Sequence, residues 1–404
     1  MTAGAVDLPL EYVKLGLRFD RLEEGFVDAY TGDRRLRAQV LDEPAPTPRG
    51  VRDQARGLLR ELDATDLAAD RVEHLRGQLT ALECTARVMA GEPVTYREEV
   101  RSYFQVDVDL GDPADYAAAH AELEDLLPGT GTLAERYAQH RRREECPPER
   151  LEAAVHALSS ALRDRVRGQY GLPEAETVQY EVVTDKPWSG FNYYEGGYRS
   201  RVAINADLPH RLGQLPHLVA HEAYPGHHTE HCRKERGLVE RDRHLEHTVF
   251  LVNTPECLMA EGLADLGLEA AVGPGWGPWA QEVLADLGLR LDGGLSERVS
   301  AAAAPLNRVR QDAAVMLHDR GAPTEDVVAH LQRWSLVSRD RAAQQLRFLT
   351  HPLWRAYITT YVEGYDLLAG WLAARPAGQS AADRFLRLLD EPLTPARVTA
   401  ELAG

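Results

Sequence analysis

Residues 215–228, LPHLVAHEAYPGHH, form the stretch from which the fold and the chemistry of this chain are inferred. Apolar residues alternate with histidines at helical spacing, and Glu222 directly follows His221. Zinc hydrolases need two neutral imidazoles, a third ligand and a carboxylate base that activates water. The stretch therefore predicts a zinc site on a helix, with Glu222 as the base.

The spacing of the histidines departs from the usual zinc-peptidase pattern His-Glu-x-x-His. The fourth residue after His221 is Pro225, and the next histidine is His227. In a straight helix His227 would lie ~9 Å further along the axis. Pro225 interrupts a helix, and Gly226 can adopt backbone conformations that other residues avoid. We therefore expect a kink or bulge that brings His227 back towards His221, with both as ligands.

Other assignments of the histidines stay open. His228 is the alternate ligand to His227. The pairs His217–His221 and His227–His231 are both four residues apart, a spacing that can chelate in a straight helix. Histidines on the surface or at a helix end would need no metal.

The third ligand is expected on the apolar helix near residues 254–265. Glu261 and Asp265 lie four residues apart on it, where burial of two acids would be costly. The burial of both acids is explained if Glu261 binds the metal and Asp265 orients a histidine ligand through a hydrogen bond. Glu256, in the first turn after Pro255, is the rival ligand, although an acid there also suits the helix dipole.

The rest of the sequence is mainly helical. Residues 7–90 are typical of several amphipathic helices, and Pro148 opens a helix with an apolar stripe. Only residues 178–205 are typical of strands, two or three of them, and everything after Leu215 again suggests helices. We expect a helical N-terminal lobe (1–150) packed on a metal-binding catalytic lobe (151–404) as one continuous unit, with a small antiparallel sheet next to the metal site.

Bulk properties exclude several classes of function. The chain has 404 residues and a formal net charge of −17, which argues against nucleic acid and anionic membranes as partners. The start of the sequence does not resemble a secretory signal. Four cysteines without metal-site spacing suggest free thiols in the cytoplasm. The oligomeric state stays open, a homodimer included.

The run His221-Glu222-x-x-Pro225-Gly226-His227 resembles the hallmark of bacterial domain-of-unknown-function 885 proteins. These are regarded as zinc metallopeptidases, distantly similar to bilobed, helical gluzincin carboxypeptidases. Residues 261–264 (EGLA) resemble the family's Glu-Gly-Trp-Ala, with Leu263 in place of Trp, and residues 361–364 (YVEG) resemble its Tyr-x-x-Gly. Ala314 stands where an Asp precedes the histidine that matches His318. The resemblance covers residues 178–368.

The resemblance implies hydrolysis of an amide bond in a short peptide or modified amino acid, with Zn²⁺ held by His221, His227 and Glu261. Tyr361 and His318 are the expected donors to the developing oxyanion. Arg347 could hold a substrate carboxylate in a bidentate pair, as in a carboxypeptidase, or form a structural ion pair.

Two other functions fit parts of the pattern. Two histidines and one carboxylate also describe the site of non-haem iron oxygenases, although those sites usually lie on β-barrels. A non-catalytic metal-binding scaffold is the second alternative.

Residues 185–198, rich in aromatics and glycines, are the expected substrate wall. Tyr194 and Tyr198 would supply apolar contact area beside the metal and limit the cleft to small substrates. Turn and core-edge structure explains such a segment equally well.

Overall fold

Helices make up most of the computed structural model, which describes residues 6–186, 188–352 and 354–403. The α-helices are α1 (Leu8–Asp20), α2 (Arg34–Asp42), α3 (Pro48–Glu61), α4 (Ala69–Met89), α5 (Tyr96–Phe104), α6 (Pro113–Leu126), α7 (Leu133–Arg143), α8 (Pro148–Gln169), α9 (Leu215–Glu222), α10 (His227–Lys234), α11 (Pro255–Asp265), α12 (Gly267–Ala271), α13 (Trp276–Ala285), α14 (Gly293–Ala303), α15 (Arg308–His318), α16 (Thr324–Ser335), α17 (Arg339–Thr350), α18 (Tyr365–Ala373), α19 (Ala381–Asp390) and α20 (Pro395–Ala403). Short 3₁₀ turns are η1 (Leu62–Ala64), η3 (Leu245–Thr248) and η4 (Ala304–Asn307), and π-helical turns are η2 (Glu235–Arg241) and η5 (Thr360–Gly364).

Helix α8 shows how the sequence specifies these elements. Pro148 occupies its first turn, where the missing amide hydrogen costs nothing. The apolar positions of the stripe are all buried: Leu151, Val155, Leu158, Leu162 and Val166. The helix thus lies where its hydrophobic period predicts, with one face on the core.

The small sheet is mixed rather than purely antiparallel. Its strands are β2 (Thr177–Val183), β3 (Gly190–Gly196) and β4 (Arg199–Asn205), in the order β2-β4-β3. β3 and β4 form the expected antiparallel hairpin, turning at Gly196 and Gly197, which both have positive φ. β2 runs parallel to β4, because the chain crosses from β2 to the far edge before returning along the middle. The middle strand β4 is the most buried of the three, because it has a neighbouring strand on each side.

A second sheet contradicts the expectation that residues 7–90 and everything after Leu215 are helical. β1 (Val27–Tyr30) pairs antiparallel with β5 (Val249–Leu251). Strands this short show too few alternations to stand out in a sequence, and their pairing joins segments far apart in the chain.

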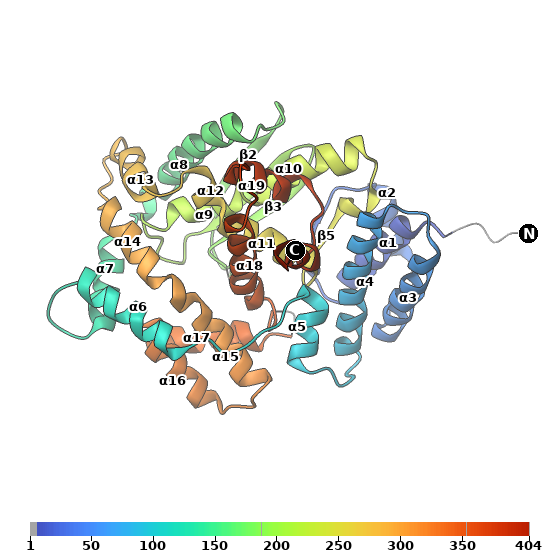
Figure 1. The fold of residues 1–404 in the computed structure, drawn as a ribbon, viewed down its shortest axis with the longest axis horizontal. Helices are drawn as coiled ribbons and strands as arrows, with labels where there is room; N and C mark the ends of the chain where they lie inside the picture. Colours follow the sequence, from blue (N-terminus) through green and yellow to red (C-terminus); the bar gives the residue numbers. More distant parts are fainter. Residues whose placement is uncertain (1–5, 187, 353, 404) are drawn as a thin grey trace, which may run out of the picture.

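Two apolar cores organise the molecule. The larger one runs from Ala81 to Val398 and covers α8, α9, α11 and the C-terminal helices. The smaller one lies among α1, α3 and α4 and includes three residues from around β5: Val249, Leu251 and Val252. Figure 1 shows α1–α4 side by side at one end of the molecule, with α11 and α18 near its middle. The division into lobes 1–150 and 151–404 stays a prediction.

None of the helices in the described part of the chain is both long and apolar enough to cross a bilayer.

Candidate metal centre

A sharp break separates the two helices that carry the histidines. α9 ends at Glu222 and α10 begins at His227. Between them the Gly226 amide donates to the Ala220 carbonyl oxygen at 2.8 Å. A Cβ on Gly226 would lie 1.9 Å from the His221 carbonyl oxygen, so only glycine fits. The break is the expected departure from a straight helix, and it brings the Nε2 atoms of His221 and His227 to 3.2 Å.

Glu261 completes the cluster from the neighbouring helix α11. Its Oε2 lies 3.3 Å from His221 Nε2, and its Oε1 lies 3.7 Å from His227 Nε2. One ligand atom from each of the three side chains lies within 4.8 Å of the others. The structure thus brings together the three side chains that the sequence predicts as metal ligands.

The chemistry of this donor set fits a divalent cation. Burial opposes protonation of His221, but hydrogen bonds to Asp265 and Glu261 raise its pKa well above its usual range. Burial likewise acts to raise the pKa of Glu261, but the hydrogen bond from His221 and the nearby histidine charges lower it to about 2. A carboxylate that stays ionised between two imidazoles is a site that a cation can occupy in place of a proton. The set of two imidazoles and one carboxylate suits zinc.

Asp265 lies where the sequence predicts it, behind His221. Its Oδ1 is 2.8 Å from His221 Nδ1, the ring nitrogen that faces away from the cluster. Such a contact fixes the orientation of the imidazole and raises its basicity.

Glu222, the last residue of α9, lies beside the cluster and close to the start of β3. A Cβ on Gly190, the first residue of β3, would lie 3.2 Å from its Oε1, and Asn192 donates to its backbone oxygen at 2.5 Å. The carboxylate has no hydrogen-bond partner in the described chain. Burial raises its pKa, and the charges of Glu261 and Asp265 add to this against the opposing histidines. A buried, unpaired carboxylate next to a cation site is suited to accept a proton.

Two tyrosines flank the cluster. Tyr361, in the π-helical turn η5, has its ring centroid 6.4 Å from that of His221. Tyr357, which the sequence analysis missed, donates its hydroxyl to Glu261 Oε1 at 2.7 Å. Since Tyr357 precedes Tyr361 by four residues, helical spacing could have revealed it.

Arg310 is a second missed residue. It has no carboxylate partner among the described residues, and its Nε is buried without a hydrogen bond. Its guanidinium lies 5.8 Å from the centroid of the Phe348 ring. Burial lowers its pKa, while its closeness to Tyr361 acts in the opposite direction. An unpaired arginine next to Tyr361 is available to an anion. No motif singles out Arg310 in the sequence, because Arg308 lies two positions before it on the same helix.

Asp28, on the unexpected strand β1, is a third missed residue. Burial, followed by the charges of Glu261 and Glu222, raises its pKa to about 7. The acid therefore lies within electrostatic reach of the cluster. No sequence pattern could have placed it there without the pairing of β1 and β5.

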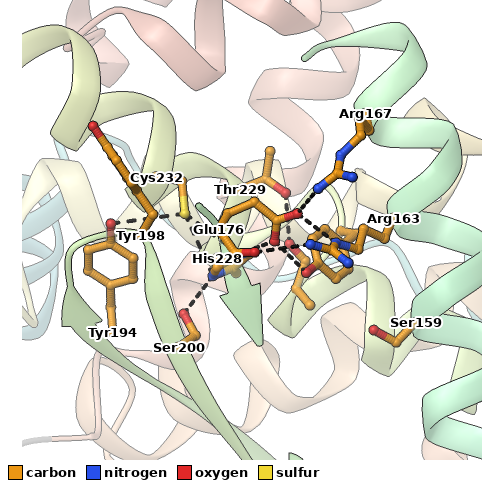
Figure 2. A network of polar contacts seen from close by, with 12 residues as sticks. Ser159, Arg163, Arg167, Glu176, Tyr194, Tyr198, Ser200, His228, Thr229 and Cys232 are labelled. Carbon is orange, nitrogen blue, oxygen red and sulfur yellow. Dashed lines mark hydrogen bonds and ion pairs between the residues drawn. The ribbon is translucent and has the colours of Figure 1, made fainter. Parts of the chain in front are cut away.

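His228, the alternate ligand, has other partners (Figure 2). Its Nδ1 lies 2.8 Å from Ser200 Oγ and its Nε2 lies 3.2 Å from Glu176 Oε2. Glu176 also binds Arg163 and Arg167, whose side chains are partly exposed. Both ring nitrogens are thus engaged in a polar network that ties α10 to the sheet and to α8, in which the His228 and Glu176 side chains are fully buried.

The other alternative ligands also lie outside the three-residue cluster. His217 is half exposed and lies 3.7 Å from Asp265 Oδ1. The His231 ring stacks on Tyr194 at 4.7 Å. Glu256 belongs to a separate group with His74 and His247.

The remaining predicted site residues make contacts elsewhere. His318 Nε2 lies 2.8 Å from the Leu349 carbonyl oxygen, and Arg347 is exposed at the end of α17. The Tyr194 hydroxyl binds Glu235 and the Tyr198 hydroxyl binds Glu240. The catalytic role of His318 and the substrate roles of Arg347, Tyr194 and Tyr198 stay predictions.

Comparisons with known proteins support the fold alone. No protein-family model matches the chain, and no curated protein matches it. A solved structure of a candidate lipoprotein of unknown function from Shewanella oneidensis matches with a TM-score of 0.52 at 13% identity, covering 98% of this chain and 82% of that one. A candidate lipoprotein from Colwellia psychrerythraea matches with a TM-score of 0.51 at 14% identity, covering 89% and 70%. An M32 carboxypeptidase from Deinococcus radiodurans R1 gives a TM-score of 0.39 at 13% identity over 97% and 92%, which is too low to support an inference.

Proposed function

We propose that this chain is a zinc-dependent hydrolase of the domain-of-unknown-function 885 type, which cleaves an amide bond in a short peptide or modified amino acid. The observation that carries the proposal is the joint placement of His221, His227 and Glu261 within 4.8 Å, with an unpaired Glu222 beside them. Asp265, bound to the outer nitrogen of His221, supports the assignment.

In the proposed reaction, zinc would polarise the substrate carbonyl and lower the pKa of a water molecule. His221, His227 and Glu261 would hold the zinc ion. Glu222 would accept the water's proton and pass it to the leaving amine, because its carboxylate is free of other partners. The Tyr361 hydroxyl, which has no hydrogen-bond partner in the described chain, would donate to the developing oxyanion. Tyr357 would hold Glu261 in place.

The substrate is proposed to carry a carboxylate, as in a carboxypeptidase reaction. Arg310 is the residue that supports this, since it is partly buried, has no carboxylate partner among the described residues and lies close to Tyr361. A guanidinium in such a place would bind a carboxylate through two parallel hydrogen bonds. Arg347, exposed near the end of α17, stays the alternative residue for this role.

A metal analysis joined to an activity assay tests the function. Protein purified without added metal and then loaded with Zn²⁺ should hydrolyse members of a panel of N-acylated dipeptides. The variant Glu222→Gln should keep its zinc while kcat falls ~10²- to 10⁴-fold. Unchanged turnover in that variant would contradict the proposed role of Glu222 as the general base. Bound iron in place of zinc, together with oxygen consumption, would favour the oxygenase. Bound metal without turnover of any substrate would favour the non-catalytic scaffold.

We propose a cytoplasmic location for the protein, because its four cysteines are free and buried. Cell fractionation with an antibody tests this, and detection in the membrane fraction would contradict it.

A further inference from the structure

A second cluster of histidines and a carboxylate lies away from the candidate active site. His74 is on α4, His247 on η3 and Glu256 in the first turn of α11. One ligand atom from each lies within 4.8 Å of the others. The imidazole rings of His74 and His247 are 4.4 Å apart between centroids, and His247 Nδ1 lies 3.8 Å from Glu256 Oε1.

The polar atoms of this cluster lack the partners that burial demands. His74 is only 4% exposed, and the His247 side chain only 2%. Within the described part of the chain, His74 Nε2 and both ring nitrogens of His247 have no hydrogen-bond partner. A buried nitrogen of this kind destabilises the fold if it is left without a partner. Each imidazole thus has at least one ring nitrogen without a partner near the Glu256 carboxylate, which indicates a missing occupant that accepts one lone pair from each ring.

We propose that His74, His247 and Glu256 form a second metal site, which binds one zinc ion and fastens the N-terminal helices to the helix that carries Glu261. Two imidazoles and one carboxylate are ligands that zinc prefers. Gln78, one turn after His74 on α4, donates to Glu256 Oε2 at 3.0 Å and so orients the carboxylate from outside. Burial lowers the pKa of His74 to about 3, so its imidazole is neutral and can bind a cation.

The neighbouring charges decide between two possible carboxylates. Glu246 forms another group with His244 and His247, but both of its oxygens bind Arg71, at 2.6 and 2.7 Å. Among the described residues, Lys234 is the one lysine or arginine that pairs with Glu256, at 3.9 Å, and Lys234 itself binds Glu230 at 2.6 Å. Glu230, Lys234 and Glu256 together carry one net negative charge. The charges around the site therefore favour binding of a divalent cation.

This proposal does not depend on catalysis at the first site. The function of the second ion is structural, because all three ligands are buried and come from three separate segments. Loss of the second ion would loosen α11, on which Glu256 precedes Glu261 by five residues.

Metal stoichiometry separates the two sites. After removal of metal with a chelator and reloading with Zn²⁺, wild type should bind two ions per chain. The double variant His221→Ala/His227→Ala should bind one, and adding His74→Gln should reduce this to none. His120→Gln, which replaces a partly buried imidazole elsewhere, should keep two. One ion that is lost with His74→Gln and kept in the double variant would support this site while contradicting the first.

One ion that disappears entirely in His221→Ala/His227→Ala would overturn the second site. If His74→Gln does not fold, anomalous scattering at the zinc edge from wild-type crystals replaces it. A peak between His74, His247 and Glu256 confirms the proposal, and density without anomalous signal there, as for a bound water, refutes it.

Discussion

Two residues around the candidate metal cluster have ionisable side chains without a partner of opposite charge among the described residues. Arg310 offers a guanidinium without a carboxylate partner, and Asp28 offers an acid held close to two other acids. Such groups are more informative than paired ones, since burial of an unpaired charge persists only where something compensates it.

The residue Arg310 should select substrates with a free carboxylate. We expect Arg310→Gln to lower kcat/KM about 10- to 100-fold on free-acid peptides, because a charge-assisted hydrogen bond contributes about 1.5–3 kcal/mol. The C-terminally amidated forms of the same peptides should show no such loss. Arg298→Gln, at an exposed position on α14, is the matched control. Equal losses on both kinds of peptide would remove the carboxylate role.

The residue Asp28 should make the metal-free protein less stable as the pH rises. Its pKa is raised to about 7 in the folded chain, by burial first and then by Glu261 and Glu222. Between pH ~4 and ~7 the folded state therefore holds a proton that the unfolded state has lost, so stability falls across this window. The full shift corresponds to about 4 kcal/mol, and partial exposure of the side chain reduces it.

Asp28→Asn should thus raise the free energy of unfolding by about 1–2 kcal/mol at pH 8 and leave it unchanged at pH 4. Urea titration of chelator-treated protein at the two pH values measures this. Asp66→Asn, at an exposed position, is the control. A gain of the same size at both pH values would show that charge is not the cause.

The residues that could be predicted from the sequence are those with a local pattern. His221, His227, Glu261 and Asp265 all come from two short motifs, and the structure brings them together. Arg310 and Asp28 lie near the cluster because of tertiary packing, so no local spacing in the sequence predicts their position.

At the scale of elements, two glycines bring α11 and η5 into direct backbone contact. A Cβ on Gly262 would lie 2.5 Å from the carbonyl carbon and oxygen of Gly364. This close approach places Tyr361 beside the cluster that contains Glu261. Gly262 and Gly364 belong to the two downstream segments of the family resemblance, so packing explains why both need glycine.

Gly262→Ala should push α11 and η5 apart. We expect a loss of about 1–3 kcal/mol in stability, since extra volume in a packed interface forces the backbone to shift. Turnover should fall as Tyr361 moves away from the metal. Gly370→Ala in α18, where nothing lies within 4 Å, should instead stabilise the protein by about 0.5–1 kcal/mol. Chemical denaturation measures both, and a neutral Gly262→Ala would contradict the close packing.

Elements with a long hydrophobic period could be predicted and short ones could not. α8 lies where its apolar stripe predicts, over 22 residues. β1 and β5, with four and three residues, depend on pairing partners more than 200 positions away and carry no independent signal.

At the scale of the whole molecule, the N-terminal helices do not form a core of their own. The core among α1, α3 and α4 takes Val249, Leu251 and Val252 from the segment just before α11. Arg71 on α4 binds Glu246 at the same junction. Apolar contacts and an ion pair thus join this layer to the helix that carries Glu261.

The two cores should therefore unfold together. Leu251 is fully buried, and a Cβ on Gly16 of α1 would lie 3.1 Å from its Cδ2. Leu251→Ala should cost about 2–5 kcal/mol, as for other buried leucines, and lower the midpoint of one common transition. Hydrogen exchange of amides in α4 and α11 reports on the two sides separately, and the variant should lose protection equally in both. If α4 alone lost protection while α11 kept it, the N-terminal helices would be an independent unit, because a cavity at a shared junction weakens both sides.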